Sequence, residues 1–202
     1  MPRRPFPGFL QALAGAGVLA ALGLAACTEP APEARPPGLQ PMVFRIDSTR
    51  IGARQEDPNL GRSFHAPDGW VRLTDAALDT VRALLPDTAA AYRYVFADPA
   101  YGSVLSIHAL PDSAALSVLA DSLGARLAAR FPADTLLRDA YEKDSLEVVQ
   151  FLVRPEGRVT FELIIAPDEV RRATFAYIVP LAWYPRAVRA VESSIGSIRR
   201  YR

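Results

Sequence analysis

The chain has 202 residues, half of them hydrophobic, with 23 basic and 22 acidic side chains and a formal net charge of +1. This balance argues against nucleic acid as a partner, because nucleic-acid binding usually requires a basic patch or stripe. The single cysteine excludes a disulfide within the chain, so stability outside the cytoplasm has to come from core packing.

The first 26 residues have the pattern of an export signal. Residues 1–7 contain Arg3 and Arg4 and no acid, and residues 9–26 are almost entirely apolar or small. This apolar run is near the lower limit for a membrane-spanning helix, so an uncleaved N-terminal anchor is the alternative interpretation. Both interpretations place residues 28–202 outside the cytoplasm.

The apolar run ends in Leu24-Ala25-Ala26-Cys27, which resembles the lipobox of bacterial lipoproteins. The resemblance implies that lipid is attached to the thiol of Cys27 and that residues 1–26, the signal peptide, are removed. Removal takes away two arginines and no acid, which leaves a formal net charge of −1. Thr28 implies outer-membrane delivery, facing the periplasm, in a cell with two membranes, because an aspartate at that position favours retention at the inner membrane.

Residues 27–41 are predicted to be the lipidated cysteine and a proline-rich tether. Five prolines and few large apolar groups favour an extended spacer, which at about 3 Å per residue reaches some 30–40 Å. A proline-rich recognition motif is the alternative. Residues 42–202 are predicted to be a single domain of a size that can bury its own core.

The first part of this domain contains short elements. The polar residues 53–62 indicate a loop, and 66–69 a turn by their residue types. Apolar spacing of three and four predicts a short helix over 75–85. Two strands are expected at 91–96 and 103–110.

Residues 112–131 form the longest predicted helix, with one apolar stripe and Asp112 placed to cap its first turn. Three strands are predicted after it, at 136–142, 146–153 and 158–165. Apolar and polar residues alternate along the last of them, and Pro155-Glu156-Gly157 suits a hairpin connection.

A further strand at 173–179 precedes a helix that begins near Pro185, where a proline is tolerated in the first turn. Strands joined by hairpins, together with two amphipathic helices, predict an α+β fold, a mostly antiparallel sheet with helices packed on it.

The order of these elements resembles a known fold. The segment Phe64–Trp70 precedes the strands and the long helix, and the final helix contains Ser193–Ile198. This is similar to the α-β-α sandwich of photosystem II extrinsic subunits, the Ran-binding nuclear import factor and many bacterial lipoproteins. The resemblance covers residues 62–202 and implies a binding or assembly role, by analogy of fold only.

No motif in the sequence indicates a reaction. The two histidines, His65 and His108, lack a nucleophile elbow and are expected to be ordinary strand residues, and we predict no catalytic residue. Zinc, EF-hand and nucleotide-binding spacings are absent from the sequence, so we expect neither a metal nor a cofactor.

Four aromatic residues are the candidates for a partner surface: Tyr92 and Tyr94 on one face of a strand, and Trp183 and Tyr184 before the final helix. The alternative is that they cover the rim of a small core. We therefore expect a lipid-anchored, non-catalytic module that binds an envelope protein. The other hypotheses are an envelope hydrolase using His65 or His108, and a carrier with a pocket for a small apolar ligand between the sheet and the 112–131 helix.

Overall fold

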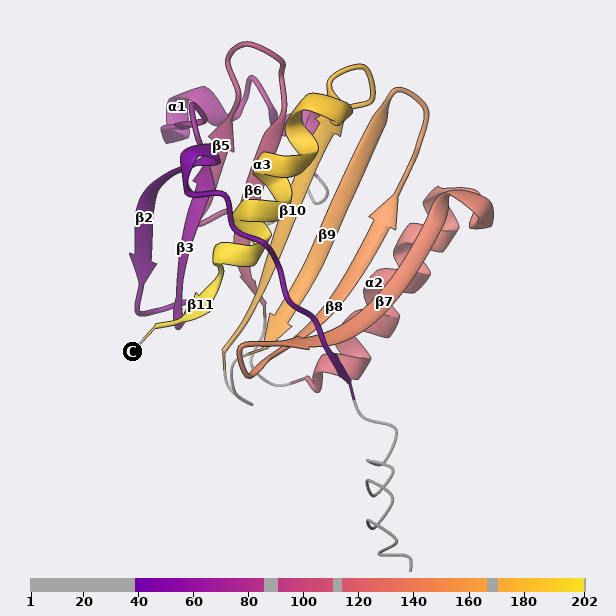
Figure 1. The fold of residues 1–202 in the computed structure, drawn as a ribbon. Coiled ribbons are helices and arrows are strands. Elements are labelled where there is room, and N and C mark those ends of the chain that lie inside the picture. The colour runs from indigo at the N-terminus through magenta and orange to yellow at the C-terminus, as the bar shows by residue number, and fades with distance from the viewer. Residues whose placement is uncertain (1–38, 86–90, 111–113, 167–170, 202) are drawn as a thin grey trace, which may run out of the picture. The chain divides into compact units, whose positions relative to one another are not determined.

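An eight-stranded sheet in the order β1-β7-β8-β9-β10-β6-β5-β4 organises the fold (Figure 1). The computed structural model describes residues 39–85, 91–110, 114–166 and 171–201. The strands are β1 (Gln40–Pro41), β4 (Val71–Arg72), β5 (Tyr94–Ala97), β6 (Val104–Leu110), β7 (Leu136–Lys143), β8 (Leu146–Val153), β9 (Arg158–Ala166) and β10 (Arg172–Pro180). All neighbours are antiparallel except β1 and β7, which are parallel. The sheet is therefore mostly antiparallel, as predicted.

The tight turns between the central strands follow from their residue types. Gly157 has a φ of 77° in the β8–β9 connection, a conformation that glycine adopts without a steric penalty. The β7–β8 turn places Asp144 and Ser145 at φ values of 50° and 62°. These short connections hold neighbouring strands in register from Leu136 to Ala166.

One face of the large sheet is covered by helix α3 (Tyr184–Ser197) and by a second, three-stranded sheet in the order β11-β3-β2 (Figure 1). Its strands are β2 (Ile51–Asp57), β3 (Arg62–Pro67) and β11 (Arg199–Arg200). A one-turn 3-10 helix, η1 (Ser48–Arg50), precedes β2. This layer encloses the larger core of the domain.

Phe64 on β3 lies in that core with no exposed surface. Its ring meets the rings of Tyr94 and Phe175 edge-on at centroid distances of 5.5 Å each, and that of Phe96 at 6.2 Å. Edge-to-face pairs of this kind contribute beyond their buried area. The small sheet is thereby joined to β5 and β10 by aromatic packing.

The serines of α3 join the helix to β3, to β10 and to the segment before β2 by hydrogen bonds. The Ser197 hydroxyl accepts from the His65 amide at 2.9 Å, and the Ser193 hydroxyl accepts from the Asp47 amide at 3.1 Å. Ser194 donates to the His65 carbonyl, and its hydroxyl is 2.9 Å from that of Tyr177. The Ser193–Ile198 segment, on which the sequence resemblance rests, therefore connects α3 by hydrogen bonds to β3, to β10 and to Asp47 before β2.

The other face of the sheet is covered by two separate groups of elements. Helix α2 (Leu116–Arg130) packs on β8 and β9. Leu85, just after the short helices α1 (Asp75–Leu78) and η2 (Arg82–Leu84), packs on β5 and β6 with Val95 and Val104. A 3-10 turn, η3 (Ala133–Thr135), leads from α2 into β7. The architecture is α+β with helices on both faces.

The prediction of a loop over 53–62 is wrong. Residues 51–57 form β2, which pairs with β3, and the turn lies at 58–61. The polar residues of β2 are mostly exposed because this strand is at the edge of the small sheet, so the stretch lacks the apolar signal of a core strand. The predicted cap Asp112 lies outside the described residues, and α2 begins at Leu116.

Candidate functional site

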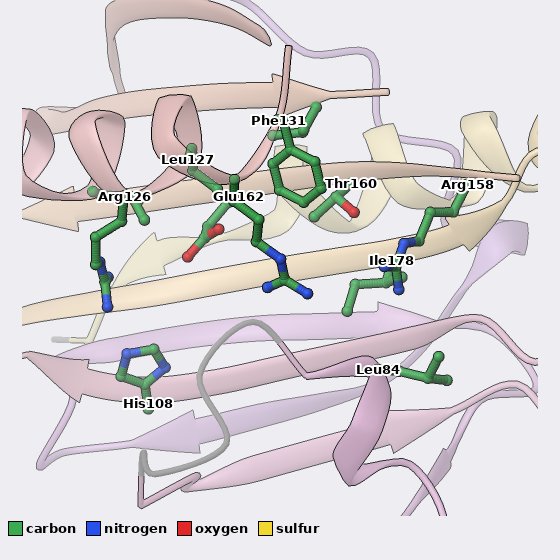
Figure 2. A pocket seen from close by; sticks show the side chains of 12 residues that line it. Leu84, His108, Arg126, Leu127, Phe131, Arg158, Thr160, Glu162 and Ile178 are labelled. Atoms are coloured by element: carbon green, nitrogen blue, oxygen red, sulfur yellow. The ribbon is translucent and has the colours of Figure 1, made fainter. Parts of the chain in front are cut away.

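A cavity of about 240 Å³ lies between α2 and the sheet (Figure 2). Figure 2 shows Arg126, Thr160 and Glu162 on the side of α2 and β9, with His108 and Leu84 on the opposite side. The cavity forms because α2 packs on β8 and β9 while Leu85 packs on β5 and β6. Strand β10 lies between these two groups of contacts.

The lining is half apolar and half polar. The apolar part consists of Leu84, Leu123, Leu127, Phe131, Val153 and Ile178. The polar part consists of His108, Arg126, Arg130, Arg158, Thr160 and Glu162. With histidine neutral, three guanidinium groups and one carboxylate give this lining a formal charge of +2.

Strand β9 shows the difference between the two faces of the sheet. Val159, Leu163 and Ile165 point into the α3-side core. Between them, Thr160 and Glu162 point toward α2, and Glu162 is only 3% exposed. Burial of a carboxylate is costly unless a hydrogen bond or an ion pair compensates it, and Glu162 has an interaction partner within the protein.

The register of the strands places small and polar groups beside Glu162. Glu162 pairs with Ala176 on β10, and Ala176 pairs with Ser106 on β6. His108 pairs with Thr174, one side-chain step further along the same face. Ser106 and Thr174 are both buried, so this face of β9, β10 and β6 is polar in its centre.

The cavity brings His108 together with a carboxylate and a hydroxyl, the combination that the hydrolase hypothesis requires. Strand β10, however, separates His108 on β6 from Thr160 and Glu162 on β9, which puts their backbones roughly 10 Å apart. A nucleophile and its base need hydrogen-bond contact, about 2.6–3.2 Å between heavy atoms. Strand order alone therefore does not give the Thr160 hydroxyl and His108 this contact.

His65 lies on β3, outside the cavity, as the sequence predicts for a strand residue. Its Nδ1 is 2.8 Å from the carbonyl oxygen of Gly52 on β2. This contact joins the two strands of the small sheet across their register irregularity. The geometry around His65 is that of a structural hydrogen bond.

The predicted pair Tyr92 and Tyr94 does not share a strand face. β5 begins at Tyr94, and Tyr92 precedes it. Tyr94 is 9% exposed and lies in the α3-side core, whereas Tyr92 packs on the opposite side, with its ring 5.4 Å from that of His108. The backbone bend at Arg93 breaks the alternation from which the prediction was made.

The Tyr94 hydroxyl belongs to a polar cluster around Asp57. The Asp57 side chain is 1% exposed and accepts from the amides of Asn59 and Leu60 and from Nε of Arg93 at 2.6 Å. Burial opposes ionisation of Asp57, but hydrogen bonds from Arg93, the Leu60 amide and Tyr94 outweigh it and lower its pKa. Tyr94 is therefore a core residue, and this removes it from the predicted partner surface.

Trp183 and Tyr184 lie at the start of α3 and are both half-buried. Tyr184 stacks on Phe161 of β9 at 6.1 Å between ring centroids and joins the α3-side core. Trp183 packs instead against Tyr101 at 4.3 Å, and the Arg186 guanidinium lies 5.2 Å from its ring centroid.

Tyr101 is 40% exposed and the neighbouring Leu181 is 52% exposed. We call Tyr101, Leu181, Trp183 and Arg186 the aromatic tip. Sequence reasoning missed Tyr101 because it lies in the β5–β6 loop, 82 positions away from Trp183. Only the tertiary structure brings the two rings together.

The aromatic tip and β1, the first strand that the structure describes, lie at opposite ends of the sheet. The Leu181 amide donates to the Gly157 carbonyl in the β8–β9 turn, whereas β1 pairs with Tyr141 and Glu142 beside the β7–β8 turn. The nine residues of β9 separate these ends by roughly 30 Å. Figure 1 shows the same arrangement, with the β5–β6 loop at the top and β1 at the bottom.

The described residues contain no group of three or more His, Cys, Asp or Glu residues placed to hold a metal ion. No helix among them is both long and apolar enough to cross a membrane. Cys27, the predicted lipid-attachment residue, lies outside the described residues.

The molecule is an α+β protein whose mostly antiparallel sheet has helices on both faces. No protein-family model and no curated protein sequence matches the chain. Among solved structures it is similar to cyanobacterial PsbP (CyanoP) from Synechocystis sp. PCC 6803, with a TM-score of 0.51 and 16% identity over 74% of this chain and 92% of that chain. This likeness confirms the predicted fold class and shows a PsbP-like fold.

Proposed function

We propose that this protein is a lipid-anchored, extracytoplasmic binding module without catalytic activity, and that it contacts an envelope protein through the aromatic tip. The observation that supports the proposal most is the position of the tip. The tip lies roughly 30 Å from the place where the predicted tether joins the sheet. A partner that binds the tip is therefore not obstructed by the attachment of the tether to the sheet.

The composition of the tip suits protein recognition. Tyrosine, tryptophan and arginine are enriched at the centres of protein interfaces because they combine large apolar area with polar groups. In the tip, Arg186 lies over the ring of Trp183, and the exposed Leu181 adds aliphatic surface. The PsbP-like fold supports a non-catalytic module by analogy.

The anchor is proposed from the sequence alone. A lipidated Cys27 would carry several acyl chains, which hold a protein stably where one chain is marginal. In a cell with two membranes, Thr28 favours the outer membrane, with the domain in the periplasm. The tether of residues 28–41 then adds some 30–40 Å of reach.

The test is site-specific photo-crosslinking in intact cells, with the photoreactive residue at Tyr101 or, as a control at the other end, at Val43. Val43 is 91% exposed, so access does not limit the control. We expect one discrete envelope protein to be captured from position 101 and not from position 43. The same products from both positions, or none from position 101, would contradict the proposal.

A second variant separates anchoring from binding. Cys27→Ser is expected to release the protein from membranes while its thermal unfolding stays the same as that of the unlipidated parent. Continued membrane association of Cys27→Ser would show that a lipid at this thiol is not the anchor.

A further inference from the structure

We propose that the cavity under α2 is a binding site for a small amphiphilic anion, an apolar chain or ring that bears one carboxylate. This inference goes beyond the protein-binding function and concerns a different part of the molecule. It replaces the purely apolar ligand of the carrier hypothesis, because half of the lining residues are polar and their formal charge is +2.

The anionic group is assigned to Arg130 and Arg158. Both line the cavity, Arg130 from the last turn of α2 and Arg158 from the first residue of β9. Within the residues that the structure describes, neither guanidinium makes an ion pair, and Arg130 lies 5.2 Å from the Phe131 ring centroid. Two like charges that share one cavity favour an anion between them, and arginine binds carboxylates through paired hydrogen bonds.

The apolar part of the ligand is assigned to the surface beside these arginines. Leu127 and Phe131 from the α2 side, Val153 from β8 and Ile178 from β10 line the same space. Leu127, Phe131 and Val153 belong to the small core under α2, so this wall is supported from behind. Burial of a ligand's apolar surface against this wall favours binding.

The size of the cavity limits the ligand. A volume of 240 Å³ is below the roughly 300 Å³ at which pockets for drug-sized molecules begin. At about 30 Å³ per water-sized group it holds about eight such groups. A chain of eight carbon atoms ending in a carboxylate matches this space.

The buried Glu162 and its neighbour Thr160 define the polarity of the remaining wall. Both lie on β9 on the same face as Arg158. The carboxylate of Glu162, which has its own interaction partner in the protein, disfavours an anion at that end, so the ligand's charged group is assigned to the end at Arg158. The site thus discriminates by charge as well as by apolar area.

The test is calorimetric titration of the purified full chain with octanoate, compared with 1-octanol and octyltrimethylammonium as uncharged and cationic probes of equal chain length. We expect saturable one-site binding of octanoate, at least ten-fold tighter than that of either control. Failure of octanoate to saturate, or equal binding of the three probes, would overturn the proposal.

Two variants localise the site. Arg158→Gln and Arg130→Gln are each expected to weaken octanoate binding at least ten-fold, because each removes one charge-assisted contact. Arg189→Gln, on the exposed side of α3, is the matched control and is expected to bind like the parent. Arg130 is exposed on α2, so its variant tests the site even if Arg158→Gln fails to fold. Unchanged binding in a folded Arg130→Gln variant would overturn the assignment.

Discussion

The two faces of the large sheet are built differently, although they share the same strands. The α3 face is filled by aromatic and aliphatic side chains from both sheets and α3. The opposite face has two smaller cores, with polar residues and a cavity between them. We therefore expect the α3-side layer to contribute more to stability than the opposite layer, where buried polar groups and a cavity replace part of the apolar packing.

We expect the largest difference between the two faces in the free energy of unfolding that is lost when one core side chain on each face is shortened to alanine. Phe64→Ala removes a fully buried ring that three other rings contact, and we expect a loss of about 3–5 kcal/mol in the free energy of unfolding. Leu127→Ala, beside the cavity and 8% exposed, is expected to cost about 2 kcal/mol. Denaturant unfolding measures both. An equal or larger loss for Leu127→Ala would contradict the division between the faces.

The buried Asp57 cluster gives the α3 layer a pH dependence. The folded-state pKa of Asp57 is lowered below its ordinary value of 3.8, so its contribution is full above that pH and is lost as pH falls through the lowered pKa. Asp57→Asn is expected to cost about 1–3 kcal/mol at pH 7 and less at pH 3.

The matched control for that prediction is Asp79→Asn, which removes one partner of Arg82 from an exposed surface pair. Surface pairs contribute about 0–1 kcal/mol, so we expect little change at either pH. Unfolding curves at pH 7 and pH 3 for the parent and both variants make the comparison. A loss in Asp57→Asn that is equally large at pH 3 would contradict the assignment to its carboxylate.

Substituting alanine for one helical glycine on each face adds a single methyl group and so compares how tightly the two faces are packed. A Cβ at Gly196 of α3 would lie 2.7 Å from Cβ of Phe44, so Gly196→Ala is expected to cost about 1–3 kcal/mol. A Cβ at Gly124 of α2 would meet only the end of the Phe151 ring, at 3.2 Å. Since alanine favours a helix over glycine by about 0.8–1.0 kcal/mol, Gly124→Ala is expected to be neutral within that range. Reversal of this order in thermal unfolding would contradict tighter packing on the α3 side.

The smallest expected effect on stability is at the cavity. Glu162→Gln keeps the size and one hydrogen-bonding oxygen of the side chain, and we expect a change in the free energy of unfolding below about 1 kcal/mol, because the loss of the carboxylate's attractive interactions is offset by the loss of its desolvation cost. Octanoate should bind this variant more tightly, since the formal charge of the lining rises from +2 to +3. A large loss of stability without a change in binding would make Glu162 a structural residue.

The fold could be predicted where residues alternate or repeat clearly. The predicted strand 146–153 has the bounds of β8, and the predicted 158–165 strand differs from β9 by one residue, because both have a strong apolar signal. β2 was missed because an edge strand with exposed polar residues has no such signal. The pattern also could not show the bend before Tyr94.

The candidate sites were less predictable because both depend on residues far apart in the sequence. The pocket hypothesis placed a cavity between the sheet and the long helix, but its arginines come from α2 and β9, and their meeting depends on strand order. The aromatic tip likewise joins Tyr101 to Trp183, which are separated along the chain by β6, α2 and the strands β7 to β10. Spacing along the chain carries no information on such pairs.

Membrane attachment of the domain, on which the proposed function depends, is tested most directly by the mass of the amino-terminal peptide of the native protein extracted from membranes. The proposed function predicts a chain that begins at Cys27 and carries the added mass of several acyl groups. An unmodified chain that begins at Met1 would contradict it.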